Sequence, residues 1–332
     1  MASTCQAVQL WFVRHFLIDT DTASDDAVAL IMALRAPGVQ VDAITVVAGN
    51  VGVEQATRNA LYTAELCGSD APVFPGAARP LLREIQHAQW FHGRDGLGDQ
   101  GYPPPHRAAE SKHAADAIAD VSSANPGIVL VTLGPLTNVA LALARRPDLA
   151  HNVSRCIVMG GNTCTEGNVT PAAEFNMWVD PEAARIVLHS GLPIELVGWH
   201  LCRGEANLLA ADIGHVLELD TPVARFAIDC NRVAMQANLR QTGETGIALP
   251  DPTAMAIALD PAICTRSSRH YVEIETHSDL TRGMTVVDRL NVAADERNRA
   301  VWAKLLGSEP NATICWELDI PRWKALLYRS LK

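Results

Sequence analysis

Several features that mark other classes of protein are missing from this sequence of 332 residues. It has no internal repeat, no low-complexity tract and no apolar run long enough to cross a bilayer. Charged residues make up only 19% of the chain, and the net charge of −10 argues against binding nucleic acid or an anionic membrane through a broad basic surface. The hydrophobic content of 48% indicates instead a globular protein with a sizeable core.

The eight cysteines are scattered and include no CxxC pair. This spacing is typical of buried, reduced thiols, and it argues against a disulfide framework or a zinc site. Residues 1–15 lack a basic start, and their apolar run is too short for a signal peptide. We therefore expect a cytoplasmic protein, with an N-terminal extension at 1–15 and a single domain at 16–332.

Strand-like and helix-like stretches alternate along the chain, and this alternation predicts the fold class. Buried strands are expected at 16–18, 39–47, 71–74, 128–133, 156–159 and 194–197. Such nearly continuous apolar strands, with helices between them, predict an α/β protein with an open, mostly parallel central sheet covered by helices on both faces.

The later part of the chain gives a different pattern. Residues 207–241 and 252–259 are expected to be helical. Two short segments, 271–275 and 284–287, predict a late antiparallel extension of the fold. A further strand at 313–318 and a closing helix at 320–331 complete the prediction.

The stretch Asp19-Thr20-Asp21-Thr22-Ala23-Ser24-Asp25-Asp26 joins the first strand to the first helix. We expect Ser24 to cap this helix, which places Asp25 and Asp26 in a first turn where the helix dipole favours negative charge. Asp19 and Asp21 need another explanation, because a carboxylate at the end of a buried strand is costly unless a positive charge neutralises it. Crowded carboxylate oxygens predict a hard cation, Ca²⁺ or Mg²⁺.

Two other aspartate motifs fit this stretch poorly. An EF-hand loop needs an oxygen ligand at Ala23 and a glycine at Ser24. The phosphatase motif of haloacid dehalogenases resembles Asp19-Thr20-Asp21 but needs Thr or Val at Ala23. A Mg²⁺-dependent phosphohydrolase that uses Asp19 and Asp21 stays open as an alternative, although it leaves the later motifs unexplained.

Polar or glycine residues also follow several other predicted strands. Asn50 follows the second strand, Gly134 follows the strand at 128–133, and Gly160 follows the strand at 156–159. In open α/β sheets, ligands bind beyond the carboxyl ends of the strands. The sequence therefore predicts a site at this edge of the sheet.

Together these motifs resemble the inosine-uridine-preferring nucleoside hydrolase family, over residues 16–288. The first motif, DxDxxxDDA, is formed by Asp19, Asp21, Asp25, Asp26 and Ala27. The others are Val46-Val47-Ala48-Gly49-Asn50, His92-Gly93-Arg94-Asp95-Gly96-Leu97-Gly98, Leu133-Gly134-Pro135-Leu136-Thr137-Asn138, Glu174-Phe175-Asn176, Asp251-Pro252-Thr253-Ala254 and the segment 280–288. The resemblance implies hydrolysis of the N-glycosidic bond of a ribonucleoside, giving ribose and a free base.

The resemblance also implies roles for individual residues. Ca²⁺ would be bound by the carboxylates of Asp21, Asp26 and Asp251 and by the backbone carbonyl of Leu133. Asp21 would act as general base on a calcium-bound water. The ribonucleoside would be held by Asp25, Asn50, Met159, Asn168, Glu174, Phe175 and Asn176. Related enzymes are homo-oligomers, so a homodimer or homotetramer is expected.

The leaving base is the least defined part of this site. Related enzymes often carry histidine just before the late metal aspartate, where this chain has Pro250. His92 is therefore expected to protonate the leaving base, since a histidine with an ordinary pKa of about 6.5 can supply a proton near neutral pH. The alternative is that His92 only shapes its glycine-rich loop or contacts a sugar hydroxyl. Trp90 either stacks on the base, as Phe91 could, or serves only in packing. A nucleoside-binding protein without catalysis stays open as a second alternative, supported only by the missing histidine.

Overall fold

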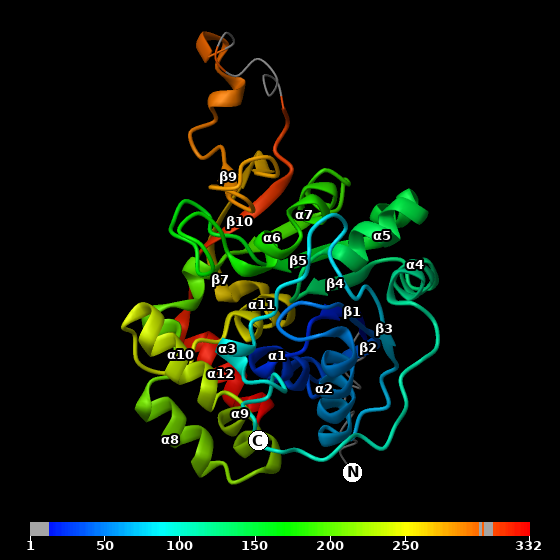
Figure 1. Ribbon diagram of the computed structural model, residues 1–332, viewed down its shortest axis with the longest axis vertical. Coiled ribbons are helices and arrows are strands. Elements are labelled where there is room, and N and C mark those ends of the chain that lie inside the picture. Colours follow the sequence, from blue (N-terminus) through cyan, green and yellow to red (C-terminus); the bar gives the residue numbers. More distant parts are fainter. Residues whose placement is uncertain (1–12, 299–300, 302–307) are drawn as a thin grey trace, which may run out of the picture.

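The computed structural model describes residues 13–298, 301 and 308–332. Its centre is an eight-stranded sheet with the strand order β3-β2-β1-β4-β5-β6-β10-β7 (Figure 1). Neighbouring strands pair in parallel except for β10 and β7, which pair antiparallel at one edge. The predicted open, mostly parallel sheet is confirmed. The strands are β1 (Arg14–Thr20), β2 (Val39–Val46), β3 (Val73–Pro75), β4 (Ile128–Thr132), β5 (Val153–Met159), β6 (Ile194–Val197), β7 (Cys264–His270) and β10 (Ala312–Leu318).

Side chains alternate along the central strands and so build two hydrophobic cores. In β1, Phe16 and Ile18 join one core whereas Leu17 joins the other. The first core is covered by α1 (Ser24–Leu34), α2 (Val53–Leu66), α9 (Pro222–Asp229), α11 (Pro250–Leu259) and α12 (Ile320–Ser330). The second is covered by α4 (Ala114–Ala124), α5 (Thr137–Arg145) and α7 (Pro181–Leu188). The prediction of helices on both faces is therefore also confirmed.

The remaining helices are short or lie around the rim of the sheet. They are α3 (Gln89–His92), α6 (Phe175–Val179), α8 (Ala210–Glu218) and α10 (Arg232–Thr242). Within the described ranges, none of the helices combines the length and apolar character that a bilayer crossing requires.

The strand order contains a switch point at the centre of the sheet. From β1 the chain moves outward through β2 and β3, and it then returns to β4 on the other side of β1 and continues through β5 and β6. At such a point the loops after β1 and β4 diverge to opposite faces and leave a crevice at the carboxyl ends of the strands. The aspartate-rich loop follows β1, and Leu133 follows β4, so both lie at this crevice.

Some elements differ from the sequence prediction. Strand β7 was not predicted, because it has a polar sequence and is mostly exposed as the edge strand of the sheet. The helical region 207–241 is divided into α8, α9 and α10 by turns near Pro222 and Asn231.

The predicted antiparallel extension is present as a separate two-stranded sheet of β8 (Val272–Ile274) and β9 (Thr285–Val287). The chain around this sheet projects from the body of the molecule at the top of Figure 1. Strand β1 begins at Arg14, inside the predicted N-terminal extension, and residues 1–12 lie outside the described part of the chain.

Candidate active site

Two helices begin at the same buried point. Asp25 and Asp26 lie in the first turn of α1, and Asp251 lies in the first turn of α11. One carboxylate oxygen from each comes within 4.8 Å of the other two, and all three residues are buried. The amino ends of both helices offset part of this negative charge through their dipoles. We call Asp25, Asp26 and Asp251 the acidic cluster.

The start of α1 is fixed by Asp26. Its Oδ2 accepts a hydrogen bond from the backbone N–H of Ala23 at 2.9 Å, and its Oδ1 accepts one from the Thr20 hydroxyl at 2.6 Å. Ala23 therefore occupies the N-cap position, and Ser24 is the first residue of the helix. The prediction that Ser24 caps the helix is wrong, because the Asp26 carboxylate makes the capping contact and leaves the Ser24 hydroxyl free for another partner.

Asp21 lies beside the acidic cluster but is not one of its three members. Its Oδ2 accepts a hydrogen bond from the backbone N–H of Asn50 at 2.6 Å, whereas its buried Oδ1 has no hydrogen-bond partner among the described residues. Gly49 and Gly134 pack directly against this carboxylate: an added Cβ would lie 2.0 Å from Oδ2 at Gly49 and 2.8 Å from Oδ1 at Gly134. The backbone at these two glycines therefore packs against the Asp21 carboxylate with no room for a side chain.

The electrostatics of these carboxylates favour the binding of a positive charge. Burial raises the pKa of Asp25 to about 7, with a further contribution from the Asp26 charge. Burial and the neighbouring carboxylates also raise the pKa values of Asp21 and Asp251 well above their usual range. Within the part of the chain that the structure describes, the buried Oδ1 atoms of Asp21 and Asp25 lack a hydrogen-bond partner. An all-oxygen donor set with unpaired buried oxygens fits a hard divalent cation, which would reverse these shifts.

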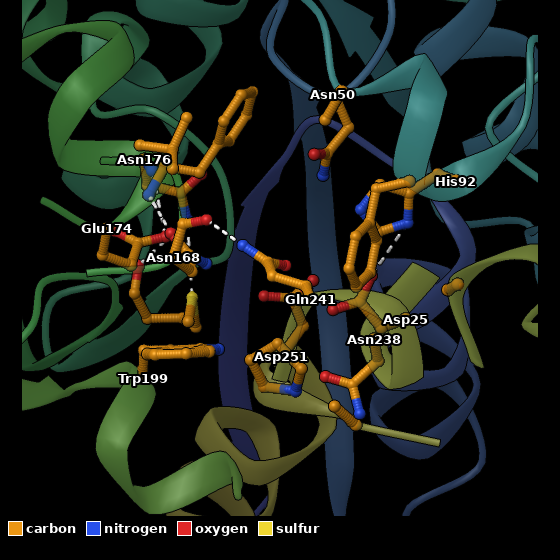
Figure 2. Close-up of a pocket in the computed structure, with 18 of the residues that line it drawn as sticks. Asp25, Asn50, His92, Asn168, Glu174, Asn176, Trp199, Asn238, Gln241 and Asp251 are labelled. Atoms are coloured by element: carbon orange, nitrogen blue, oxygen red, sulfur yellow. Dashed lines mark hydrogen bonds and ion pairs between the residues drawn. The ribbon is translucent and has the colours of Figure 1, made fainter. Parts of the chain in front are cut away.

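A pocket opens directly above the acidic cluster (Figure 2). Asp25 and Asp251 line it, whereas Asp21 and Asp26 are not among its lining residues. Every substrate residue expected from the sequence lines this pocket, together with His92 and Leu133. The expected substrate residues are Asp25, Asn50, Trp90, Met159, Asn168, Glu174, Phe175 and Asn176.

The loop between β5 and α6 forms one wall of the pocket and is held by its own polar side chains. Glu174 accepts hydrogen bonds from the backbone N–H groups of Gly161 at 2.8 Å and Asn176 at 3.0 Å. The Asn168 side chain accepts one from the N–H of Phe175 at 2.9 Å. Burial raises the pKa of Glu174. Fixed acceptors and amides of this kind are suited to binding sugar hydroxyls.

The carbonyl of Leu133 is also engaged. It accepts a hydrogen bond from the side-chain amide of Asn176 at 2.8 Å. A carbonyl oxygen has two lone pairs, so this contact leaves one available for a cation.

His92 lies on the opposite side of the pocket from Glu174 (Figure 2). Its Nδ1 shares a hydrogen bond of 2.9 Å with the Ser24 hydroxyl and lies 3.7 Å from Oδ1 of Asp25. Burial lowers the pKa of His92 to about 3. The expected ordinary pKa is therefore wrong, and the ring is neutral near pH 7.

Sequence reasoning missed the wall formed by α10. Asn238 and Gln241 on this helix line the pocket, as does Asn231 just before it. Figure 2 shows Gln241 reaching across the pocket, where its side-chain amide donates to the backbone carbonyl of Asn168. The spacing of 231, 238 and 241 places these amides on one helical face, a pattern that was visible in the sequence.

Trp199 was also missed. It lines the pocket, and the guanidinium of Arg203 lies 4.6 Å from the centre of its ring. Trp199 comes two residues after β6, at the same edge of the sheet as the other pocket residues. Its position after a predicted strand was the available signal.

Comparison with known proteins gives a consistent result. A family model described as inosine-uridine preferring nucleoside hydrolase matches residues 16–325. The pyrimidine-specific ribonucleoside hydrolase RihA of Salmonella gallinarum is 38% identical over 320 residues, which cover 95% of this chain and 97% of that protein. The protein of the same name from Shewanella woodyi is 36% identical over 322 residues, covering 96% and 98%.

Solved structures of nucleoside hydrolases share the fold. The plant nucleoside hydrolase PpNRh1 superposes with a TM-score of 0.88 at 30% identity, covering 96% of this chain and 99% of that one. A purine-preferring ribonucleoside hydrolase from Gardnerella vaginalis gives a TM-score of 0.85 at 27% identity, covering 96% and 98%. With the family model matching nearly its whole length, the chain belongs to the inosine-uridine preferring nucleoside hydrolase family and is an N-glycosyl hydrolase.

Proposed function

We propose that this enzyme hydrolyses the N-glycosidic bond of ribonucleosides with the aid of Ca²⁺, releasing ribose and a free base. The observation that carries this proposal is the position of the acidic cluster at one end of a pocket whose wall presents Glu174, Asn168 and Asn176. The cluster suits a hard cation, and the wall suits the hydroxyl groups of a sugar. The names of the relatives described above support the same reaction.

We assign Asp26 and Asp251 to the cation, because they belong both to the ligand set that the sequence motif implies and to the acidic cluster. We assign Asp21 and the carbonyl of Leu133 to the same ion, because Asp21 lies beside Asp25 and Asp26 and Leu133 lines the pocket. When bound, Ca²⁺ supplies the positive charge that these carboxylates lack and lowers the pKa of water beside it.

Asp21 is the proposed general base. Its Oδ2 is held by the N–H of Asn50, so the carboxylate cannot rotate freely and its Oδ1 is left to accept a proton from the attacking water. General-base assistance of this kind contributes roughly a hundredfold to ten-thousandfold to a rate.

The ribose would be held by Asp25, Asn50, Met159, Asn168, Glu174, Phe175 and Asn176. Cleavage of a glycosidic bond passes through a state in which positive charge develops on the sugar. Fixed carboxylate and amide oxygens around the ring stabilise that charge more than they stabilise the neutral nucleoside. Glu174 is suited to this role because its two oxygens are already oriented by backbone N–H groups.

The base would lie between α3 and α10, which contact each other beside the pocket. Trp90 on α3 is a proposed stacking partner, and Asn238 and Gln241 on α10 offer amides. We propose that neutral His92 contributes a hydrogen bond to the departing base, in place of the proton donation expected from an ordinary pKa.

The test is a panel of purine and pyrimidine ribonucleosides, scored separately for free ribose and free base. Equimolar release of both from at least one nucleoside is the expected result. Phosphate release from phosphorylated substrates, with no ribose from any nucleoside, would instead indicate the phosphohydrolase. Tight nucleoside binding without turnover would indicate a binding protein.

A further inference from the structure

We propose that Ser24 is a positioning residue that fixes the orientation of the His92 ring in the pocket. The orientation of the ring is inferred from the hydrogen bond between these two side chains. The effect on the reaction rate rests in addition on the proposed function. The sequence motifs assign Ser24 no role in binding or catalysis, and its hydroxyl lies next to the acidic cluster without belonging to it.

The contact is direct and shielded from water. Ser24 Oγ and His92 Nδ1 lie 2.9 Å apart, although 68 positions separate them in the sequence. Ser24 is fully buried, and only 7% of His92 is exposed. Within the described part of the chain this is the one hydrogen bond made by either side chain. A buried hydrogen bond of this kind holds an imidazole in one of its two flipped orientations.

The backbone of Ser24 is fixed by hydrogen bonds to its carbonyl group. Its backbone carbonyl accepts hydrogen bonds from the side-chain amide of Asn231 at 3.2 Å and from the thiol of Cys230 at 3.5 Å. These residues form the junction of α9 and α10, against which Gly98 of the glycine-rich loop also packs. The serine hydroxyl is therefore presented to His92 from a fixed backbone.

A second link joins the same two segments. The side-chain amide of Asn59 donates to the carbonyl of Thr22 at 2.9 Å and to the carbonyl of Asp95 at 2.8 Å. The loop after β1 and the loop after His92 are thus tied together near their ends. With the backbones fixed in this way, the Ser24 hydroxyl is left to set the rotation of the His92 ring.

Loss of the hydroxyl has a specific consequence for His92. Without Ser24 Oγ, Nδ1 loses the one hydrogen bond that the described residues give it, and Oδ1 of Asp25 at 3.7 Å is beyond ordinary hydrogen-bond distance. The ring would then lose its fixed orientation, and its contact with the leaving base would be made in only part of the population. Ser24 therefore acts on the reaction through His92.

A double-mutant cycle tests this inference. Ser24→Ala is expected to lower kcat/KM for the best nucleoside by about twofold to tenfold, the range for one neutral hydrogen bond. In a His92→Ala background, the same change is expected to have no further effect. Ser122→Ala is the matched control, because the hydroxyl of this buried serine on α4 makes no hydrogen bond to any described residue and lies on the other face of the sheet. Equal losses from Ser24→Ala in both backgrounds would overturn the inference.

A spectroscopic readout separates this inference from the proposed function. With ¹⁵N-labelled histidine, the ring-nitrogen signals that disappear in His92→Ala are assigned to His92. They are expected to shift in Ser24→Ala and to stay in place in Ser122→Ala. Ser24→Thr and Ser24→Val introduce side chains of equal shape, but only threonine keeps the hydroxyl. The His92 signals should therefore stay in place in Ser24→Thr and shift in Ser24→Val. Unshifted His92 signals in Ser24→Ala or Ser24→Val would overturn the inference, even if no nucleoside is hydrolysed.

Discussion

The two oxygens of Asp21 have opposite surroundings, and this asymmetry defines its chemistry. Oδ2 accepts a hydrogen bond from the Asn50 N–H at 2.6 Å, whereas Oδ1 is buried and finds no partner in residues 13–298, 301 and 308–332. An unpartnered buried carboxylate oxygen is costly to fold, so it is expected to be kept for a functional reason. The proposed reason is proton transfer from water beside the cation.

Asp21→Asn tests this role, because asparagine keeps the shape of the side chain but cannot accept the proton. We expect turnover to fall by roughly two to four orders of magnitude. Nucleoside binding, measured by calorimetry, should be retained. Asp148→Asn serves as control, since the Asp148 side chain is 63% exposed and lies away from the pocket. Near-normal turnover of Asp21→Asn would show that another group activates the water.

The individual pocket residues were only partly predictable from sequence. Asn50, Asn168 and Glu174 were found because they belong to local motifs that can be read along the chain. Trp199 and Gln241 were missed, because a residue outside such a motif reaches the pocket only through the packing of its element against others. The pKa of His92 was mispredicted for a similar reason, since burial depends on segments distant in the sequence.

At the level of elements, the carboxyl ends of β1, β2 and β4 meet around one carboxylate. Gly49 follows β2 and Gly134 follows β4, and both approach Asp21 too closely for any side chain. These glycines are therefore required by proximity and not by an unusual backbone conformation. The aligned ends of parallel strands bring the residues after each strand to one place.

Gly49→Ala tests this arrangement. The added Cβ would lie 2.0 Å from Oδ2 of Asp21, so the carboxylate must move. We expect a loss of stability of about 1–3 kcal/mol from overpacking, together with severe loss of ribose release. Gly214→Ala in α8 is the matched control, because nothing lies within 4 Å of its added Cβ and alanine favours a helix by roughly 0.5–1 kcal/mol. Urea unfolding of both variants gives the comparison, and an unchanged Gly49→Ala protein would contradict the account.

The elements themselves were predicted where an apolar pattern defines them. The central strands β1, β2, β4, β5 and β6 were recognised from their buried runs. The edge strand β7 was not, since it is polar and pairs with β10, a strand that lies far along the chain. Pairing with a distant strand leaves no local signal in a polar sequence.

On the scale of the whole molecule, several carboxyl groups are buried at the centre of the fold. The chain carries a net charge of −10, and Asp21 and the acidic cluster are buried together at the switch point of the sheet. Helix dipoles offset only part of this charge. The stability of the metal-free protein is therefore expected to depend on pH. The single domain at 16–332 and the homodimer or homotetramer stay predictions.

The direction of this dependence follows from the pKa shifts. Burial raises the pKa of Asp25 from its usual 3.8 to about 7, so the folded protein binds this proton more tightly than the unfolded chain. The free energy of unfolding should then fall as the pH rises from about 4 through about 7, and Asp21 and Asp251 act in the same direction. The pKa of His92 is lowered from 6.5 to about 3, so the unfolded chain binds this proton more tightly than the folded protein. The contribution of His92 to the free energy of unfolding therefore falls as the pH drops below about 6.5, which opposes the effect of the aspartates.

Chemical denaturation in chelator at pH 5 and pH 8 measures this effect. Added Ca²⁺ is expected to raise stability more at pH 8, where the carboxylates are charged, than at pH 5. The Asp251→Asn variant, which lacks one carboxylate of the acidic cluster, should show a smaller difference. An equal effect of Ca²⁺ at both pH values would argue against binding by these buried carboxylates.

Restoration of activity by calcium tests whether the enzyme needs Ca²⁺ for hydrolysis. The protein is stripped with chelator, and Ca²⁺ is added back while bound metal and ribose release from the preferred nucleoside are measured in the same samples. We expect no activity in the stripped protein. The rate of ribose release should then rise in proportion to bound Ca²⁺ until about one ion is bound per chain. Full activity in protein that contains no metal would contradict a need for Ca²⁺.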